Sequence, residues 1–283
     1  LPIKVLRGSR LIYDQHDLCP ELIRAKRMSG AKVFTRVAEV LERLSYKLSD
    51  HVIVTNNSYR TVALTRGRVS ADDVSVVRSA PENTWNESPQ TSLRWKNGRR
   101  YMIGYVGVIG RQEGIEYLLN SMKILVTEEG IDVQCVLVGS GPDIARLKTL
   151  CRTLELDDHI TFTGRVSDDD LRHILATADV CVNPDEVNEL NDKSTMNKII
   201  EYMAIGKPIV QFDVAEGRFS AGPSSLYAAP NDSADFAACI SKLLMDEELR
   251  ESMGKKGQQR FETTLAWEFQ APILVRAYES VGA

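Results

Sequence analysis

The sequence lacks the features that define several large functional classes. No apolar run approaches the roughly 18 residues that suggest a membrane-spanning helix, and no signal-peptide pattern is visible. With a formal net charge of −4, the chain also lacks the basic excess typical of nucleic-acid-binding proteins. We therefore expect a cytoplasmic protein without a nucleic-acid partner, which reaches a membrane at most peripherally, at its inner face.

Cysteines are few, and several catalytic motifs are missing. The five cysteines form no C-x-x-C motif and have no histidine at ligand spacing, and Cys135 and Cys181 lie in apolar, strand-like runs. We expect free thiols, buried at these two positions, and no metal. The P-loop and G-x-S-x-G motifs are absent, and Pro142 interrupts the dinucleotide fingerprint that begins at Gly139. A dehydrogenase is therefore the least favoured enzyme class.

The pattern that is present predicts an α/β protein. Strand-like runs alternate with helical segments of about ten residues, which is typical of doubly wound parallel sheets. We expect strands at 10–14, 51–55, 74–78, 102–108, 133–138, 160–163, 180–183 and 208–212. Residues 82–98 lose this periodicity. We expect a domain over 1–82, a linker over 83–98, a second domain over 99–265 and a terminal helix over 266–283.

A basic amphipathic segment lies early in the chain. Seven Lys or Arg residues stand against two Glu residues between Leu22 and Lys47, and the apolar residues of 32–48 recur at helical spacing. The more common explanation is the solvated outer face of a crossover helix. The alternative is contact with an anionic membrane surface, or with an acceptor anchored there.

The stretch 191–208 predicts a capped helix with unusual charges. Ser194 or Thr195 is expected to accept from a first-turn N–H, and Gly206 ends the helix. The helix dipole disfavours Lys198 in a first turn, so we expect an anion, above all a phosphate, to recruit it. Glu201 follows one turn later. An ordinary solvated helix face is the alternative.

Other polar groups follow the predicted strands. Gly107, Gly110 and Gly114 would let a bulky anion approach the backbone, and Arg111 could bind a phosphate, although tight packing also selects glycine. The aspartates at 168–170 suggest a dipole-matched helix start rather than a metal site. Of the histidines, those at 51, 159 and 173 suggest structural roles. His16 stands beside Asp17 in a polar loop after a strand, and its role stays open on this ground alone.

An ordered series of motifs resembles a known family. It comprises Tyr105-Val106-Gly107, Val138-Gly139-x-Gly141-Pro142, Phe162-Thr163-Gly164-Arg165-Val166, Ala178-Asp179-Val180-x-Val182-x-Pro184 and Glu201-x-Met203-Ala204-x-Gly206-Lys207-Pro208. This series is similar to the nucleotide-sugar-binding half of GT-B glycosyltransferases, most closely the retaining family 4 enzymes. The upstream segments 12–21 and 55–59 resemble the later part of the family's acceptor-side domain.

The resemblance implies a GT-B fold with two Rossmann-like domains, the C-terminal one complete and the N-terminal one partial. It implies that roughly the first hundred residues of a typical chain are missing, and that the terminal helix crosses back over the first domain. Its implied site residues fall into four groups. Glu201 would hold the ribose; Gly164, Arg165 and Val166 would meet the base; Gly107, Val108, Gly110, Thr195, Met196, Asn197 and Lys198 would hold the diphosphate; and His16, with Asp17, would contact the donor sugar.

Three positions depart from the family pattern. Lys193 stands where the first of the family's two acids would lie, Val108 replaces the usual Arg, and Glu113 replaces the usual Lys. Arg111 and Lys198 are the nearest substitute cations. The Met-Asn-Lys variant at 196–198 resembles a subgroup associated with bacterial surface-polysaccharide assembly.

The resemblance implies a retaining glycosyltransferase that uses a nucleotide-diphosphate sugar as substrate, with uridine the preferred base, and needs no metal or other cofactor. The acceptor would be a sugar, a lipid-linked or a small-molecule hydroxyl compound. Since no nucleophilic carboxylate is evident near His16 or Lys198, we expect front-face attack in which the leaving phosphate takes the acceptor proton. A nucleotide-sugar-binding fragment without turnover and a sugar-nucleotide epimerase are the alternatives.

Overall fold

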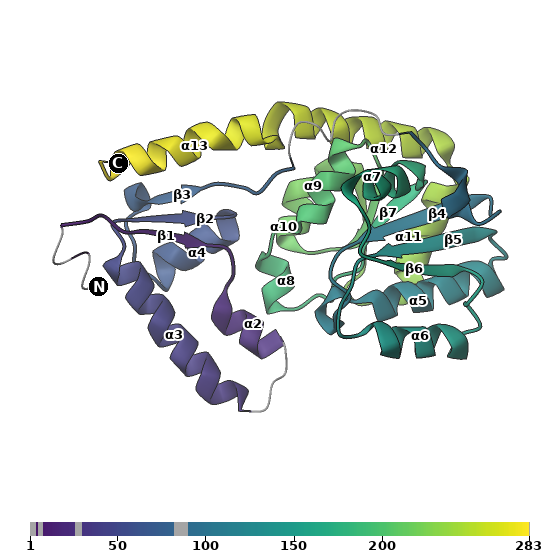
Figure 1. Ribbon diagram of the computed structural model, residues 1–283, viewed down its shortest axis with the longest axis horizontal. Coiled ribbons are helices and arrows are strands. Elements are labelled where there is room, and N and C mark those ends of the chain that lie inside the picture. The colour runs from purple at the N-terminus through teal and green to yellow at the C-terminus, as the bar shows by residue number, and fades with distance from the viewer. Residues whose placement is uncertain (1–3, 5–7, 26–29, 82–89, 283) are drawn as a thin grey trace. The chain divides into compact units, whose positions relative to one another are not determined.

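The computed structural model describes the chain except for residues 1–3, 5–7, 26–29, 82–89 and 283 (Figure 1). The chain forms two compact units. The first contains Leu1–Ala80, Asn188–Thr195 and Leu265–Ala283, and the second contains Pro81–Val187 and Met196–Thr264. The short segment 188–195 thus belongs to the first unit, although it lies between two strands of the second in the sequence.

The first unit is built on a three-stranded parallel sheet in the order β1-β2-β3. Its strands are β1 (Ile12–Gln15), β2 (His51–Val54) and β3 (Val74–Val76), and its helices are α2 (Cys19–Ala25), α3 (Ala31–Leu48), α4 (Asn57–Thr65), α8 (Glu189–Lys193) and α13 (Trp267–Ser280). Tyr46, Val52, Val54 and Tyr59 belong to its buried core. This apolar contact explains why the runs at 51–54 and 59–63 fold against each other.

The last helix belongs to this first unit. The backbone N–H of Arg78, after β3, donates to Oε1 of Gln270 in α13 over 3.1 Å. Near the end of α13 the Ser280 hydroxyl lies 3.4 Å from Nδ1 of His51. Residues more than 190 positions apart in sequence are therefore joined within one unit.

The second unit is a six-stranded parallel sheet in the order β6-β5-β4-β7-β8-β9. Its strands are β4 (Tyr101–Val106), β5 (Val133–Val138), β6 (Ile160–Gly164), β7 (Val180–Asn183), β8 (Ile209–Phe212) and β9 (Ser225–Ala228). Its helices are α5 (Ile115–Lys123), α6 (Ile144–Thr153), α7 (Asp168–Thr177), α9 (Asn197–Ala204), α10 (Ala215–Ala221), α11 (Ser233–Met245) and α12 (Glu247–Arg260). The expected α/β class with parallel sheets is confirmed.

Helices cover both faces of the second sheet (Figure 1). α5, α6 and α11 lie on one face, and α9 with α10 and α12 lies on the other. Short π-helical segments, Ile124–Glu128 and Phe261–Leu265, extend α5 and α12. Because the strand order reverses direction beside β4, the loops after β4 and β7 meet at a switch point, where ligands bind in folds of this kind.

The structure also describes the state of the cysteines and the lengths of the apolar helices. All five cysteines are free, and Cys135 and Cys181 are buried, as expected. Burial holds the pKa of the Cys181 thiol near 12, so this group is inert at neutral pH. Among the described residues, no helix is both long enough and apolar enough to cross a membrane.

Two helix starts differ in how they are capped. The helix after β2 is capped by Asn56, just before its first residue, since Oδ1 of Asn56 accepts from the N–H of Tyr59 over 2.8 Å. We expected Ser194 or Thr195 to cap α9, whereas its N-cap is Met196, which has no side-chain cap hydrogen bond. Both side chains have other partners: the Ser194 hydroxyl donates to the Leu190 carbonyl, and the Thr195 hydroxyl accepts from Asn56.

The aspartates at 168–170 form the first turn of α7, as the sequence indicated. Ser167 caps this helix, with its hydroxyl accepting from the N–H of Asp170. Asp170 pairs with Arg94, and Asp169 pairs with Arg172. The acids thus lie where the helix dipole favours them. No cluster that could hold a metal ion occurs among the residues placed in the structure.

Candidate functional site

The loops that follow β4, β5 and β7 are packed backbone against backbone. A Cβ added to Gly139 would lie 1.8 Å from the carbonyl oxygen of Gly107, and one added to Gly114 would lie 1.9 Å from that of Pro184. The N–H of Gly107 donates to Val138, and the N–H of Gly139 donates to Gly164. Tight packing between loops therefore explains Gly114 and Gly139, while the approach of an anion to the backbone at Gly107 and Gly110 stays a prediction.

Lys198 lies at the centre of this loop cluster. Its ammonium nitrogen is 2.8 Å from Oδ1 of Asp185 and 3.3 Å from Oε2 of Glu113, and it lies 4.9 Å from the ring centroid of Tyr105. The residue is only 8% exposed, so the alternative of a solvated helix face is wrong at this position. The anions beside the lysine in the structure are carboxylates of the protein itself, and the phosphate that we expected stays a prediction.

Burial and pairing fix the protonation of this cluster. Burial, the largest single influence, lowers the pKa of Lys198, but Asp185 and the other neighbours, Tyr105 and Glu113 among them, together outweigh it and hold the lysine pKa well above its usual value. Burial raises the pKa of Asp185 to about 7, against the opposing pull of Lys198. The lysine is therefore a permanent cation, and its aspartate partner titrates near neutral pH.

Lys198 also explains one departure from the family pattern. Glu113 occupies the position of the family's usual lysine, and the ammonium group of Lys198 lies within hydrogen-bonding distance of it. A cation supplied by the helix α9 therefore lies beside position 113. The sequence indicated no nucleophilic carboxylate near Lys198. The fold brings in Glu113 from 85 positions away, and its carboxylate is paired with the lysine.

The start of α9 has no side-chain cap, although the N–H of Ile199 already donates to the Met196 carbonyl over 3.1 Å. Met196 provides no side-chain cap, and Asn197, the first helical residue, is exposed. The first N–H groups of a helix have no partner within the helix, and the dipole makes this end partially positive. The start of α9 is therefore suited to an anion.

Glu201 lies one turn further along α9. Its carboxyl group is half-buried, and no described residue forms a hydrogen bond or an ion pair with it. Burial raises the pKa of this carboxyl group, while the charge of Lys198 lowers it by a smaller amount. A partly desolvated acceptor without a partner carries a free-energy cost that hydroxyl donors from a ligand would remove.

The remaining predicted donor-side residues surround these groups in the second unit. Val108 and Arg111 follow β4, with Gly110 buried between them, and Arg165 and Val166 follow Gly164 at the end of β6. Arg111 and Arg165 are exposed, and neither forms an ion pair within the described part of the chain. A Cβ at Gly164 would meet no atom within 4 Å, so space is open beside it.

The other predicted residues belong to the first unit. His16 and Asp17 are exposed after β1, and Nε2 of His16 lies 3.2 Å from Oδ1 of Asp14. Thr195 is hydrogen-bonded to Asn56. Lys193 forms an ion pair with Glu189, over 3.0 Å. Sequence reasoning missed Asp185, which follows a strand and Pro184 but belongs to no motif.

Comparison with known proteins places these features in a family. A family model described as "Glycosyl transferases group 1" matches residues 100–246. The alpha-D-kanosaminyltransferase of Streptomyces kanamyceticus is 25% identical over 79% of this chain and 58% of its own length. The capsular polysaccharide biosynthesis glycosyltransferase CapM of Staphylococcus aureus is 23% identical over 87% of this chain and 66% of its own length.

A solved structure shows the same fold. Anabaena HepE in complex with UDP and glucose superposes with a TM-score of 0.79 at 16% identity, over 99% of this chain and 73% of that one. The chain spans 58% of the length of the kanosaminyltransferase and 66% of that of CapM.

Proposed function

The chain belongs to the group 1 glycosyl transferases, and we propose that it transfers a sugar from a uridine diphosphate sugar to an acceptor hydroxyl with retention of configuration. The acceptor is a sugar, a lipid-linked or a small-molecule hydroxyl compound, used in bacterial surface-polysaccharide or glycoconjugate synthesis. HepE, of similar fold, was solved with UDP and glucose, which supports uridine as the base. The observation that carries the proposal is the partnerless carboxyl group of Glu201, one turn into a helix without a side-chain cap.

In this proposal α9 supplies most of the nucleotide contacts. Glu201 accepts hydrogen bonds from the ribose hydroxyls, which restores the solvation that burial removed. Gly164, Arg165 and Val166 meet the base. The open space beside Gly164 and the exposure of Arg165 support this assignment.

The diphosphate binds at the start of α9. The N–H groups of Asn197 and Lys198, in its first turn, and the loop from Gly107 to Gly110 donate to the phosphate oxygens. An ammonium group has three donors, and Asp185 and Glu113 take two of those of Lys198. The Tyr105 hydroxyl also interacts with this ammonium group, so Lys198 acts on the diphosphate through its charge. Arg111, exposed and without an ion pair among the described residues, adds a second cation.

The reaction exchanges one bond at the anomeric carbon for another on the same face. The bond to the leaving phosphate oxygen breaks, the acceptor oxygen bonds to the anomeric carbon, and the leaving phosphate takes the acceptor proton. Negative charge grows on the diphosphate, where Lys198 and the start of α9 stabilise it. His16 and Asp17 contact the donor sugar.

An alternative mechanism would have two steps, in which a carboxylate of the protein attacks the sugar and forms a covalent intermediate. The carboxylates near Lys198 are poor nucleophiles for such a mechanism. The Asp185 side chain is 2% exposed and is hydrogen-bonded to Lys198, and Glu113 is paired with the same ammonium group. Replacing Glu113→Gln should therefore leave measurable turnover. Complete loss of turnover with unchanged UDP affinity would instead indicate a covalent intermediate on Glu113.

Calorimetric titration with UDP, GDP and their sugars tests the nucleotide assignment. We expect UDP to bind and Glu201→Ala to weaken it between tenfold and a hundredfold, because a hydrogen bond to a charged group contributes roughly 1.5–3 kcal/mol. Glu251→Ala, which removes an exposed carboxylate of α12, is the matched control and should bind as the parent does. Absence of nucleotide binding, or equal binding by Glu201→Ala, would refute the assignment.

Turnover assays separate the three functions that the sequence left open. Sugar transfer to an acceptor, or slow donor hydrolysis, is expected of a transferase. Nucleotide binding without either reaction would identify a binding module. Conversion of the donor sugar without an acceptor would identify an epimerase.

A further inference from the structure

The cluster around Lys198 contains more acids than bases. Asp185 and Glu113 both lie within hydrogen-bonding distance of the lysine ammonium group. The two tyrosines beside it, Tyr105 and Tyr202, are neutral at physiological pH, because burial raises the pKa of each hydroxyl group. When both carboxyl groups are ionised, the cluster therefore has a net negative charge. Such a charge would oppose the binding of a diphosphate beside it.

The cluster lies against the groups to which we assign the diphosphate. Lys198 belongs to the first turn of α9, where the N-cap Met196 provides no side-chain cap. Its side chain passes beside the glycine loop, since a Cβ built on Gly107 would lie 3.6 Å from Cε of Lys198. In a buried setting the repulsion between like charges is much stronger than in water. The charge of the two acids therefore affects an anion bound at this place.

Asp185 is the member of the cluster that is suited to hold a proton. Its side chain is 2% exposed, and its Oδ1 lies 2.8 Å from the ammonium nitrogen of Lys198. Its Oδ2 is buried and receives no hydrogen bond from any residue that the structure describes. Burial raises the pKa of Asp185 to about 7, against the opposing charge of Lys198, and the nearby carboxylate of Glu113 adds to the rise. A protonated Asp185 can donate a hydrogen bond to Glu113, which favours the neutral form further.

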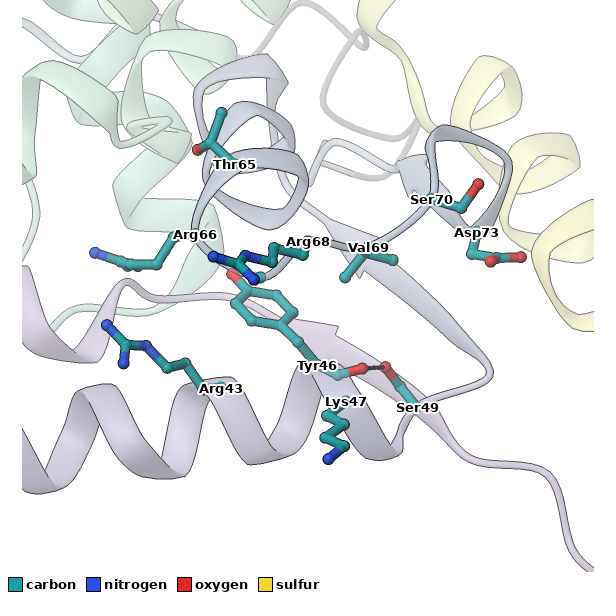
Figure 2. Close-up of a pocket in the computed structure, with 11 residues that line it drawn as sticks. Arg43, Tyr46, Lys47, Ser49, Thr65, Arg66, Arg68, Val69, Ser70 and Asp73 are labelled. Carbon is teal, nitrogen blue, oxygen red and sulfur yellow. Dashed lines mark hydrogen bonds between the residues drawn. The ribbon is translucent and has the colours of Figure 1, made fainter.

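Arg66 of the first unit, labelled in Figure 2, also pairs with two acids, but its geometry differs. It donates two hydrogen bonds to Glu21 and one to Glu42, and its Nε lies 2.6 Å from the other Glu42 oxygen. A planar guanidinium group can hold two carboxylates in this way, whereas an ammonium group is a compact point charge. Lys198 donates one hydrogen bond to each of its acids. The lysine cluster therefore leaves one buried carboxylate oxygen, Oδ2 of Asp185, that a proton would satisfy.

We propose that a diphosphate binds beside Lys198 together with a proton, which Asp185 takes up from the solvent. This inference rests on the proposed function, because the diphosphate is that of the nucleotide sugar. The incoming anion adds negative charge to the cluster, and the proton taken from water or buffer by the Asp185 carboxylate offsets it. The charge of Lys198 is then less compensated and acts on the diphosphate. Asp185 is thus a positioning residue, which acts through Lys198 without touching the substrate.

The direction of the pH dependence follows from this coupling. Below the Asp185 pKa of about 7 the free protein already holds the proton, so binding requires no uptake. Above this pKa the ionised Asp185 gains a proton on binding. Nucleotide affinity should therefore fall as pH rises, by up to about tenfold per pH unit. Lys198 keeps its charge throughout, because its own pKa lies well above the usual value.

Calorimetric titration in two buffers of different ionisation enthalpy measures the number of protons taken up on binding. UDP-glucose is the first probe, because its diphosphate has no phosphate group that titrates near neutral pH. UDP is the second probe, and comparison between variants removes the contribution of its titrating terminal phosphate. We expect the parent to take up a substantial fraction of one proton at about pH 8. Its affinity should fall about threefold or more between about pH 7 and about pH 8.5.

Three variants locate the proton. Asp185→Asn keeps the shape of the side chain but does not titrate, so it should bind UDP-glucose without proton uptake and with little dependence on pH. Glu113→Gln removes one negative charge from the cluster and should reduce the uptake. Asp213→Asn is the matched control, because it removes a carboxylate of the same unit whose pKa is lowered by its hydrogen bonds to Arg218. Its proton uptake should equal that of the parent, and circular dichroism should confirm the fold of each variant.

The possible outcomes separate this inference from the proposed function. Nucleotide binding by the parent without proton uptake would overturn the inference and leave the proposed function intact. Equal uptake by the parent and Asp185→Asn would also overturn it, because the proton would then belong to another group. If Asp185→Asn does not fold, equal uptake by the parent and Glu113→Gln would overturn it instead. Binding of neither UDP nor UDP-glucose would refute the proposed function itself, and the inference with it.

Discussion

The ammonium nitrogen of Lys198 lies 2.8 Å from Oδ1 of Asp185, and both residues are almost completely buried. The pair joins the start of α9 to the loop after β7. The periodicity of the sequence does not indicate that these two elements are in contact. Taking two charges out of water is costly, so each depends on the other for compensation.

Removing one member of this pair should therefore destabilise the protein strongly. We expect Lys198→Ala to lower the free energy of unfolding by roughly 3–5 kcal/mol, because it leaves a buried carboxylate unpaired. Urea unfolding at alkaline pH measures this effect, because the loss of Lys198 raises the Asp185 pKa further and a pH near 7 would leave its carboxyl group protonated. The control is Lys198→Met combined with Asp185→Asn, which should recover most of the loss. A double variant as unstable as Lys198→Ala would contradict the explanation.

The same pair predicts a pH dependence of stability. The pKa of Asp185 rises from 3.8 in the unfolded chain to about 7 in the folded one, chiefly because of burial. Between these values the folded state binds a proton that the unfolded state has released, so the contribution of Asp185 to stability falls as pH rises. We expect the free energy of unfolding of the parent, relative to Asp185→Asn, to decrease from about pH 4 to pH 7. Parallel curves for the two proteins would disprove the shift.

Two loop glycines should respond very differently to alanine. Gly139→Ala would place a Cβ 1.8 Å from the Gly107 carbonyl oxygen, so we expect a loss of about 3 kcal/mol or more. Gly164→Ala meets open space, and its φ of 71° alone should cost roughly 1–2 kcal/mol. Thermal and urea unfolding compare the two variants directly. Equal losses would show that backbone conformation, rather than loop packing, selects these glycines.

The cap of α4 gives a prediction within the first unit. Asn56 accepts from Tyr59 and donates to the carbonyl oxygen of Lys193, over 2.9 Å, and to the Thr195 hydroxyl, over 3.0 Å. We expect Asn56→Ala to cost about 2–3 kcal/mol, since it removes a cap and two further hydrogen bonds. Asn57→Ala, at the neighbouring exposed position, should change stability by no more than about 0.5 kcal/mol. Denaturant unfolding of both variants is the measurement.

The regular elements could be predicted because their signals are local. The bounds of β5 and β7 agree with the apolar runs at 133–138 and 180–183, and α7 begins at Asp168, after a serine that caps it. Short or polar elements were missed because they carry no such local signal. α8 spans five residues, and its cap and hydrogen bonds produce no hydrophobic period.

The candidate site was only partly predictable. The α9 helix and the nearby departure from the family pattern at Lys193 could be identified from the sequence, because both lie in one continuous stretch, 191–208. The burial of Lys198 could not, because it depends on Glu113 and Asp185, which pair with it only after β4 and β7 have become neighbours in the sheet. The role of Asn56 depends in the same way on residues 193–195, almost 140 positions away.

The assignment of residues 188–195 to the first unit has a consequence for how the protein can be divided. The chain passes between the two units four times, at 80/81, 187/188, 195/196 and 264/265. Neither unit is therefore a continuous piece of the polypeptide. A single cut between residues 80 and 81 would still leave three covalent connections, so no one break point in the gene yields either unit as an intact, separate product.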